Sequence, residues 1–380
     1  MTLSKKKKVL IVDDSAFMRK VITDILSEST ELEVLAAARN GRDALEKLKT
    51  LTPDVITLDV EMPIMDGLEA LKEIMKVKPT PVVMLSSTTE KGAENTVLAM
   101  EWGAVDFVAK PGGAISLNLT DIQDEIIEKV LAASTVSVKK LTEASPTITR
   151  NRQTPSISRP TIRETKKEAP IARQTTMTAK ATKRFTSSAK TVIAIGTSTG
   201  GPRALQEVLT NLPKNLAAPI VIVQHMPPGF TKSLADRLDT LSHIHVKEVE
   251  HGEVLENGTA YIAPGGQHFT VRRLGMAFVA EVSAKEPPRR GHRPSVDMLF
   301  ESVARLPNIK CLAVVMTGMG NDGMEGVKYL KTSVETIAIA ESQETSVVYG
   351  MPRAVVDAQL ADEVTRLDNI AQSIVDIVES

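Results

Sequence analysis

The second half of the chain carries a serine, a histidine and an aspartate in settings that suit nucleophilic hydrolysis. Ser198 lies in a glycine-rich turn after an apolar run, His225 directly follows a second apolar run, and Asp322 lies in a glycine-flanked turn after a third. A serine hydroxyl becomes a good nucleophile when a base within hydrogen-bond reach accepts its proton and an acid orients that base. The sequence therefore predicts Ser198 as nucleophile, His225 as general base and Asp322 as the orienting acid.

Two alternatives to this assignment arise from the same part of the chain. Asp297 is a second candidate for the acid, but its context predicts the first turn of a helix, where acids are common because they oppose the helix dipole. The glycine-rich turn could instead bind the phosphates of a nucleotide, as such turns do between a strand and a helix. It contains no Gly-Lys-Ser/Thr, however, and the next strand ends in Gln224-His225 where a dinucleotide site would have an acid. We therefore favour hydrolysis, with Asp322 as the acid.

The other histidines have simpler interpretations. His243 and His245 alternate as on one face of a strand, but no further cysteine or histidine completes a zinc site, so we interpret them as surface residues. We expect His251 and His292 in loops. His268 follows a Pro-Gly-Gly turn and could line the cleft, which leaves its role open.

In the first half of the chain, acids and a lysine follow successive apolar runs. Asp13 and Asp14 follow the first run, Asp59 the third, Ser86 the fourth and Lys110 the fifth. Side chains at the carboxyl ends of parallel strands meet where the strand order reverses, and clustered carboxylates need cations to offset their repulsion. Oxygen ligands suit Mg²⁺, so the three acids predict a magnesium site beside the lysine. A turn with a helix cap would explain the first two acids alone, but not the whole set.

Short apolar runs that alternate with amphipathic stretches predict the elements that position these residues. The expected strands cover residues 9–12, 32–38, 55–58, 82–85 and 107–109, then 192–196, 220–224, 313–317 and 336–340. We therefore predict an α/β protein with two sheets: an N-terminal (βα)5 parallel sheet and a C-terminal doubly wound sheet. Glycine-rich turns at 256–258 and 264–266 predict antiparallel hairpins inserted into the second domain.

Between these domains, Ser, Thr, Pro and basic residues replace the apolar pattern. Residues 139–190 carry thirteen Lys and Arg against three Asp and Glu, with hardly any large apolar side chain, so burial cannot offset the entropy lost on ordering them. We expect domains at 8–130 and 191–376, joined by a flexible basic linker at 131–190. The linker lacks the interleaved aromatic residues that stack on bases, so we expect no nucleic-acid partner.

Composition also bears on where the protein acts. No apolar run approaches the roughly 18 residues of a membrane helix, so we expect no membrane insertion. The single cysteine, Cys311, lies inside an apolar run, which excludes a disulfide framework and indicates a reducing compartment. We therefore expect a cytoplasmic protein.

Residues 8 to about 130 closely resemble response-regulator receivers. The matching motifs are Val12-Asp13-Asp14-Ser15, the run from Leu58-Asp59 to Asp66-Gly67, Leu85-Ser86 and Ala109-Lys110-Pro111. The resemblance implies that Asp59 is the phosphoacceptor, that Lys110 contacts the phosphoryl group, and that the three acids bind the Mg²⁺ needed for phosphorylation. It also implies that Ser86 and Phe107 form the switch pair and that a chemotaxis histidine kinase is the phosphodonor.

Residues 191 to about 376 closely resemble the catalytic domain of the chemotaxis protein-glutamate methylesterases. The motifs that carry this resemblance are Gly196-Thr-Ser198-Thr-Gly200-Gly201, Gln224-His225-Met226, Tyr261-Ile-Ala-Pro264-Gly265, Arg293-Pro-Ser-Val-Asp297 and Thr317-Gly-Met-Gly320-Asn-Asp322-Gly323. The resemblance implies the same Ser-His-Asp roles. It further implies that the Met319 amide is an oxyanion-hole donor and that the esterase needs no cofactor.

Together the two resemblances imply an enzyme of bacterial chemotaxis that phosphorylation activates. Its substrates would be the methyl-accepting chemotaxis receptors, with glutamate methyl esters on their cytoplasmic helices hydrolysed to release methanol. It would also deamidate receptor glutamines, because both reactions pass through the same tetrahedral oxyanion. These reactions would mediate adaptation.

Overall fold

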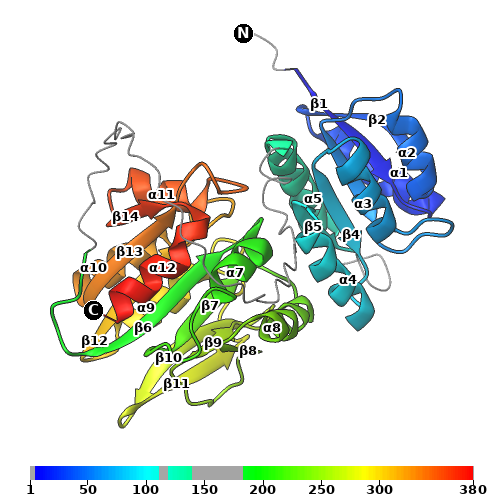
Figure 1. Cartoon of the computed structure of the whole chain (residues 1–380). Coiled ribbons are helices and arrows are strands. Elements are labelled where there is room, and N and C mark those ends of the chain that lie inside the picture. The colour runs from blue at the N-terminus through cyan, green and yellow to red at the C-terminus, as the bar shows by residue number, and fades with distance from the viewer. Residues whose placement is uncertain (1–4, 111–118, 139–182, 380) are drawn as a thin grey trace, which may run out of the picture.

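The computed structural model describes residues 5–110, 119–138 and 183–379. Two parallel sheets, each covered by helices, form two α/β domains that lie side by side, with the N-terminal domain on the right in Figure 1. A small antiparallel sheet belongs to the C-terminal domain. This architecture confirms the predicted fold class.

The N-terminal sheet has the strand order β2-β1-β3-β4-β5, and its strands pair in parallel. The order reverses between β1 and β3, so the carboxyl ends of these strands flank a crevice. The elements of this domain are β1 (Lys7–Val12), α1 (Ala16–Glu28), β2 (Leu32–Ala38), α2 (Gly41–Leu48), β3 (Val55–Asp59), α3 (Gly67–Val77), β4 (Val82–Ser86), α4 (Glu90–Glu101), β5 (Asp106–Ala109) and α5 (Leu119–Ser134).

The C-terminal sheet has the strand order β14-β13-β12-β6-β7-β9-β8, again with parallel pairings. The first strand of this sheet, β6, is central; β7 lies on one side of it and β12 on the other. The strand order therefore reverses at β6, and the carboxyl ends of β6, β7 and β12 lie at that point. The elements are β6 (Lys190–Thr197), α7 (Gly201–Leu209), β7 (Ile220–Gln224), α8 (Phe230–Leu241), β8 (His245–Glu248), β9 (Thr259–Ile262), β10 (His268–Leu274), β11 (Ala277–Ser283), α9 (Val296–Ala304), β12 (Ile309–Val315), α10 (Met324–Ser333), β13 (Glu335–Glu341), α11 (Met351–Asp357), β14 (Glu363–Thr365) and α12 (Leu367–Val378).

The antiparallel insertion is present, but it is not where the glycine-rich turns predicted it. Strand β9 pairs in parallel with both β7 and β8, and all four of its residues are buried. The hairpin instead joins β10 to β11 across Gly275. Ala260, Tyr261 and Ile262 are apolar on both faces, as an interior parallel strand requires, whereas a half-exposed hairpin strand would alternate with polar residues.

Amphipathic helices cover both faces of each sheet. Helix α3 turns Leu71 and Ile74 toward the first sheet, and α12 turns Ile370 and Ile374 toward the second; all four side chains are fully buried. Full burial of one such side chain contributes roughly 1.5–3 kcal/mol, so these faces hold the helices in place. Among the helices described, none combines the length and the apolarity that crossing a bilayer would require.

Most of the expected linker, residues 139–182, lies outside the described residues. The described chain before β6 already makes ordered contacts with the C-terminal domain. Phe185 packs against its core, and the amides of Thr186 and Ser187 donate to the Glu335 carboxylate at 2.6 and 3.1 Å. Contact with the second domain therefore begins several residues before the first strand of its sheet.

Candidate functional site

An acidic cluster with a lysine lies at the carboxyl edge of the N-terminal sheet. Lys110 Nζ lies 2.8 Å from Asp13 Oδ2 and 2.8 Å from Asp59 Oδ1. Asp14 completes the cluster, since one carboxylate oxygen from each of the three acids lies within 4.8 Å of the others. The structure thus brings together four of the five residues that the sequence placed at the strand ends of this sheet, Ser86 being the fifth.

The charge of this cluster suits a divalent cation. Burial raises the pKa of Asp59 to about 6, against the opposing effect of Lys110 and with a further increase from the charge of Asp13. A cation within reach of three carboxylates would favour their ionised forms, and Mg²⁺ prefers oxygen ligands. The residues present therefore fit a magnesium ion held by Asp13, Asp14 and Asp59.

The two expected switch residues, Ser86 and Phe107, contact different parts of the molecule. The Ser86 hydroxyl is buried and donates to the Gly92 carbonyl in the first turn of α4, at 3.0 Å. Phe107 is buried and its ring stacks on Phe230 of α8, with ring centroids 4.7 Å apart. Ser86 therefore connects this edge to α4, whereas Phe107 contacts the C-terminal domain.

Ser198 lies in the turn between β6 and α7. Its amide donates to the Thr317 carbonyl at 3.0 Å, and its carbonyl accepts from the Gly201 amide at 2.7 Å. Gly200 precedes the first turn of α7 with φ at 77°, a left-handed conformation that glycine adopts without strain. These bonds hold Ser198 where β6 and the neighbouring β12 both end.

His225 follows β7 and lies next to the Ser198 turn, because its amide donates to the Thr197 carbonyl at 3.2 Å. Its Nε2 lies 2.9 Å from Asp322 Oδ2. Its Nδ1 is buried and has no hydrogen-bond partner among the residues that the structure describes. Since Nε2 faces the acid, Nδ1 is the ring nitrogen that is available to act as a base.

Asp322 is held by the first turn of α9 as well as by His225. Its Oδ2 accepts from the Val296 amide at 2.7 Å, and its Oδ1 accepts from the Ser295 hydroxyl at 3.0 Å and the Asp297 amide at 2.9 Å. Burial alone raises the pKa of Asp322, but the hydrogen bonds from His225 and from these amides outweigh it and hold the pKa well below its usual value. Asp322 is therefore an ionised acid with a fixed orientation.

Asp297, the alternative acid, lies in the first turn of α9, as its sequence context predicted. Its Oδ1 accepts from the amides of Gly323 and Gly326 at 2.9 and 2.7 Å. Burial, together with the nearby charge of Asp322, raises the pKa of Asp297. Asp297 therefore braces the loop that carries Asp322, while Asp322 is the acid hydrogen-bonded to His225.

The loop after β12 brings Met319 close to the Ser198 turn. The Gly318 carbonyl accepts from the amides of Gly350 and Met351 at 3.1 and 2.9 Å, which fixes the loop. A Cβ atom at Gly318 would lie 2.8 Å from Ser198 Cβ, so the two backbones approach more closely than a side chain allows. Met319, the expected oxyanion-hole donor, is the next residue in the chain after this close approach to Ser198.

His292 is the residue near this site that the sequence interpretation missed. It lies in a loop, as expected, but its ring stacks on the ring of His225 with centroids 4.0 Å apart and planes inclined by 9°. Burial lowers the pKa of His292 to about 4, with His225 and Lys129 adding to the effect and Asp322 opposing it. In the sequence, its position directly before the Arg293-Pro-Ser-Val-Asp297 motif could have indicated that it lies near the site.

The remaining histidines lie away from the His225–Asp322 pair. His243 and His245 are exposed, and the Nδ1 atom of His245 lies 2.7 Å from Asp239. His251 pairs with the backbone of Val282. His268, left open by the sequence, is buried and hydrogen-bonds through Nε2 to a backbone carbonyl at 3.1 Å.

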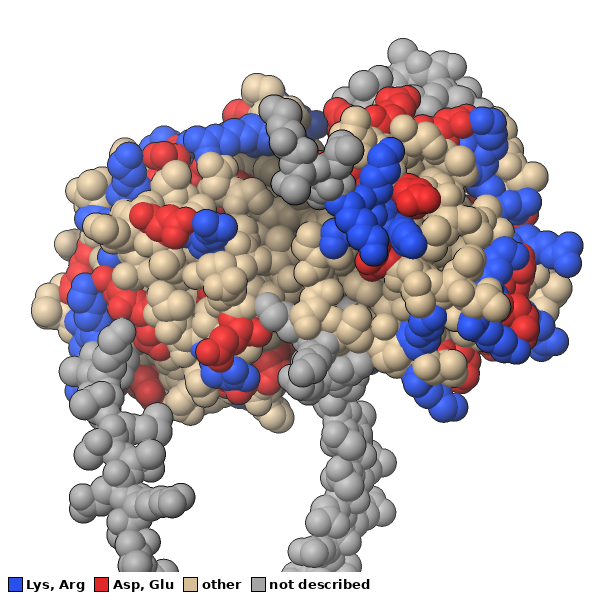
Figure 2. All heavy atoms as spheres, turned by 90° about the horizontal axis from the view of Figure 1, so that it is seen from above, with Lys and Arg blue, Asp and Glu red and all other residues tan. Residues whose placement is uncertain are grey.

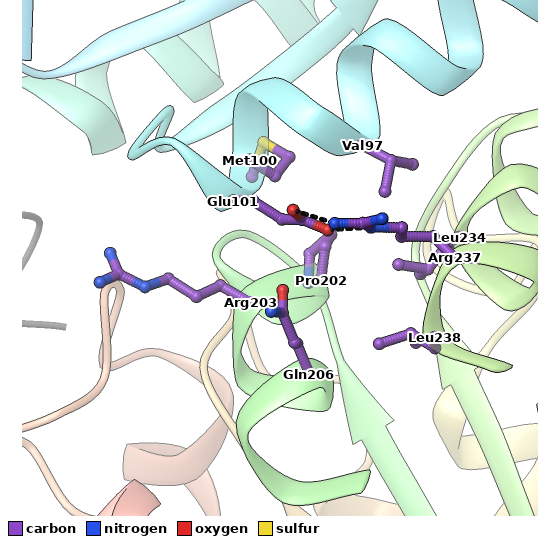
Figure 3. Close-up of a pocket in the computed structure, with 9 residues that line it drawn as sticks. All are labelled: Val97, Met100, Glu101, Pro202, Arg203, Gln206, Leu234, Arg237 and Leu238. Carbon is purple, nitrogen blue, oxygen red and sulfur yellow. Dashed lines mark hydrogen bonds and ion pairs between the residues drawn. The ribbon is translucent and has the colours of Figure 1, made fainter. Parts of the chain in front are cut away.

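The two domains contact each other through α4 on one side and α7 and α8 on the other. Glu101 of α4 and Arg237 of α8 form a bidentate ion pair, with N–O distances of 2.6 and 2.9 Å, drawn as dashed lines in Figure 3. Val97, Leu234 and Leu238 line the small pocket around the pair. A charged pair within an apolar contact thus joins the domains.

A second contact between the domains reaches the Ser198 turn itself. The hydroxyl of Thr199, the residue after Ser198, donates to the carboxylate of Asp106 at the start of β5, and both side chains are buried. Lys129 of α5 lies 3.5 Å from the same carboxylate. Val347, which follows β13, packs against the core of the N-terminal domain. The N-terminal domain therefore directly contacts the residue beside the candidate nucleophile.

Comparison with known proteins finds relatives for both domains of the chain. A response regulator receiver domain model matches residues 9–119, and a CheB methylesterase model matches residues 193–374. A protein-glutamate methylesterase/protein-glutamine glutaminase of Geobacillus kaustophilus is 55% identical over 98% of this chain and 99% of its own length. The chain belongs to this family. Proteins of the same name from Halalkalibacterium halodurans and Bacillus subtilis are 52% and 46% identical over 98% of this chain, and over 99% and 98% of their own.

Membership in the protein-glutamate methylesterase family confirms the predicted fusion of a receiver to an esterase. The solved structure of the Thermotoga maritima CheB methylesterase catalytic domain is 42% identical, covers 49% of this chain and 97% of its own, and has a TM-score of 0.47. The matches to the two family models show that this methylesterase carries its catalytic domain behind a receiver, an arrangement that implies a role in chemotaxis adaptation.

Proposed function

We propose that this methylesterase hydrolyses glutamate methyl esters on the cytoplasmic helices of methyl-accepting chemotaxis receptors, releases methanol, and also deamidates receptor glutamines. The observation that carries the proposal is the His225–Asp322 pair beside the Ser198 turn, because it supplies a base, an acid and a nucleophile. The name of its relatives, protein-glutamate methylesterase/protein-glutamine glutaminase, supports both substrate groups. Receptor helices on the cytoplasmic side imply a cytoplasmic enzyme.

In the acylation step, Ser198 Oγ attacks the ester carbonyl carbon while His225 Nδ1 accepts the hydroxyl proton. The hydrogen bond from Nε2 to Asp322 fixes the tautomer, and the ionised acid stabilises the imidazolium that forms. The carbonyl oxygen becomes an oxyanion, to which the Met319 amide donates. When the tetrahedral intermediate collapses, the C–O bond to the methoxy group breaks, His225 returns the proton to the methoxy oxygen, and methanol leaves.

Deacylation uses water in place of the receptor side chain. His225 accepts a proton from a water molecule, the hydroxyl attacks the acyl-Ser198 carbonyl, and Ser198 leaves with the proton that His225 returns. The product is a glutamate carboxylate. With a glutamine as substrate, ammonia leaves in the first step and the same acyl-enzyme forms, so one site serves both reactions.

A fluorophosphonate should label Ser198 in the full chain, because these reagents react with a hydroxyl that a neighbouring base activates. Mass spectrometry of a protease digest would locate the adduct. Ser198→Ala should abolish labelling, and Ser233→Ala, on α8, should leave it unchanged. A labelling rate at Ser198 no higher than at Ser233 would mean that Ser198 is not activated.

In the receiver, we propose that Asp59 takes a phosphoryl group from a chemotaxis histidine kinase. A carboxylate oxygen of Asp59 attacks phosphorus, and the bond from phosphorus to the donor nitrogen breaks. Asp13, Asp14 and Asp59 would hold Mg²⁺, which offsets the charge of the phosphoryl oxygens when bound. Lys110 lies 2.8 Å from Asp59 and would donate to one of those oxygens. We propose a receiver at 8–130, a linker at 131–190 and a catalytic domain at 191–376, with the end of α5 and the stretch from Phe185 as the parts of 131–190 that pack on the two domains.

One face of the molecule (Figure 2) carries charged side chains of both signs rather than a continuous basic surface. On the face drawn in Figure 2, Lys and Arg side chains are interspersed with Asp and Glu, and a hollow with mainly uncharged walls lies among them. Nucleic-acid sites present continuous basic surfaces that follow the phosphate backbone. This face does not have that character.

We further propose that the receiver restrains the esterase until it is phosphorylated. The contact between Thr199 and Asp106 holds the Ser198 turn against the receiver, and the Glu101–Arg237 pair fastens the two domains. The linker at 131–190 keeps the local concentration of the two domains on the order of millimolar. A small interface is then enough to keep the domains in contact most of the time.

Phosphorylation would act on this interface through Ser86. The Ser86 hydroxyl now donates to the Gly92 carbonyl in the first turn of α4. If it turns toward a phosphoryl group on Asp59, that bond is lost, and α4, which carries Glu101, can shift. Moving the domains from mostly closed to mostly open requires a few kcal/mol, within reach of such a change.

Weakening the interface should raise the basal activity of the unphosphorylated enzyme. Deletion of residues 1–135 should give a fragment more active than the unphosphorylated full chain and unresponsive to a small phosphodonor. Arg237→Ala in the full chain should give a smaller increase, because it removes the ion pair with Glu101 but keeps the Thr199 contact. Methanol release from methylated receptors measures both.

The matched control is Lys232→Ala, since Lys232 lies on the same helix and pairs with Asp236 of that helix. It should leave basal activity unchanged. A fragment less active than the unphosphorylated parent would show that the receiver is purely an activator, and the restraint would have to be abandoned.

A further inference from the structure

The ring of His225 is held in two perpendicular directions. In its own plane, Nε2 bonds to the fixed carboxylate of Asp322 at 2.9 Å. On its face, His292 lies flat, with centroids 4.0 Å apart and planes inclined by 9°. A hydrogen bond at one ring nitrogen leaves the imidazole free to swing about that bond, whereas a flat contact on its face opposes this motion.

The loop that carries His292 is fixed by contacts of its own. The amide of each of Arg289 and His292 donates to the carbonyl of the other at 3.0 Å, which closes a tight turn. His268 Nε2 lies 3.1 Å from the Pro287 carbonyl, and Arg289 pairs with Glu301 of α9 at 2.7 Å. The backbone that carries the His292 ring is therefore held by contacts other than the stacking on His225.

The ring is also uncharged at neutral pH. Burial, with smaller effects from His225 and Lys129, holds the pKa of His292 near 4, while Asp322 opposes this shift. A neutral aromatic face can lie against His225 when that ring takes up the proton of Ser198, whereas a second cation at 4.0 Å would repel it. His292 is thus compatible with both charge states of the base.

We infer that His292 is a positioning residue for the esterase reaction: its ring packs on the face of His225 and fixes the orientation of the imidazole whose Nδ1 is the proposed base. The inference rests on the proposed roles of Ser198 and His225. His292 itself acts through shape and not through proton transfer. A flat ring without nitrogens should therefore serve in its place.

The test compares His292→Ala, His292→Leu and His292→Phe in the full chain, with methylated receptor as substrate. We expect His292→Ala to lower kcat by roughly 10–100-fold with little change in KM, because small misplacement of a catalytic group costs about this much. His292→Leu should lose nearly as much. His292→Phe should stay within a few-fold of the unaltered enzyme, and the rate of fluorophosphonate labelling should follow the same order.

Two further variants distinguish a failure of the His292 inference from a failure of the proposed triad. His243→Ala, at an exposed histidine, should match the unaltered enzyme. His225→Ala should be inactive; if it were active, the proposed triad itself would be wrong. With His225→Ala inactive, full activity in His292→Ala would show that the stacked ring is not needed.

Equal losses in His292→Phe and His292→Ala would mean that the ring nitrogens matter, and the packing role would be overturned. Thermal unfolding of each variant would identify any that fails to fold. Should His292→Ala be unfolded, the comparison of Phe with Leu still decides: Phe active and Leu impaired supports the inference, and equal activities contradict it.

Discussion

Ser198→Ala and His225→Ala should each lower methyl ester hydrolysis by several orders of magnitude, on the order of 10⁴-fold or more. In the proposed mechanism, Ser198 supplies the atom that forms the acyl bond, and His225 supplies the base that makes this atom reactive. The double variant should be little worse than either single one, because residues that act as one unit do not contribute independently. Methanol release from methylated receptors, measured at saturating substrate, gives the comparison.

The same assay decides between the two buried acids. Asp322→Asn should cause a large loss, because an amide can donate to His225 Nε2 and so favour the wrong tautomer. Asp297→Asn is the matched control in the same network: an amide oxygen can still accept from Gly323 and Gly326, so the loss should be much smaller. If Asp297→Asn proved the more damaging, Asp322 would not be the acid of the triad.

Asp59→Asn should abolish phosphorylation of the receiver and the activation that depends on it. The substitution keeps the size of the side chain and removes only the carboxylate proposed to attack phosphorus, so the fold should persist. Incorporation of phosphate from a small phosphodonor measures the first effect, and methanol release with and without phosphodonor measures the second. Undiminished incorporation in the variant would show that another residue accepts the phosphoryl group.

Asp66→Asn provides a control close to the site. Asp66 caps α3 by accepting from the Glu69 amide at 2.8 Å, and asparagine caps helices equally well. This variant should therefore take up phosphate as the unaltered enzyme does, which separates loss of the phosphoacceptor from a general effect of removing a nearby charge.

Strand ends explain why so much of both sites could be predicted from sequence. Asp13, Asp59 and Lys110 follow apolar runs, and in a parallel sheet such residues meet at one edge. Lys110 Nζ indeed lies 2.8 Å from a carboxylate oxygen of each acid. The same logic placed His225 and Asp322 together. It also favoured Asp322 over Asp297, which lies in the first turn of α9 as expected and whose carboxylate accepts from the amides of Gly323 and Gly326.

Contacts between loops and between domains could not be predicted in this way. The stacking of His292 on His225 depends on a turn between Arg289 and His292 that leaves no periodic pattern in the sequence. Phe107 matched a switch position, but its stacking on Phe230 depends on how two separately folded surfaces fit. The misplaced hairpin has a related cause, because glycine-rich turns indicate a reversal of the chain but not its partner strand.

Thr199, the neighbour of Ser198, hydrogen-bonds to the receiver itself, so under the proposed restraint one of the contacts between the domains lies directly beside the serine that is restrained. This arrangement requires no relay of helices inside the catalytic domain. Selection can therefore adjust the ratio of resting to stimulated activity by substitutions on the domain surfaces, such as at Arg237, while the chemistry of the triad stays as it is. The degree to which phosphorylation activates the enzyme and the turnover number of its active site can therefore evolve independently.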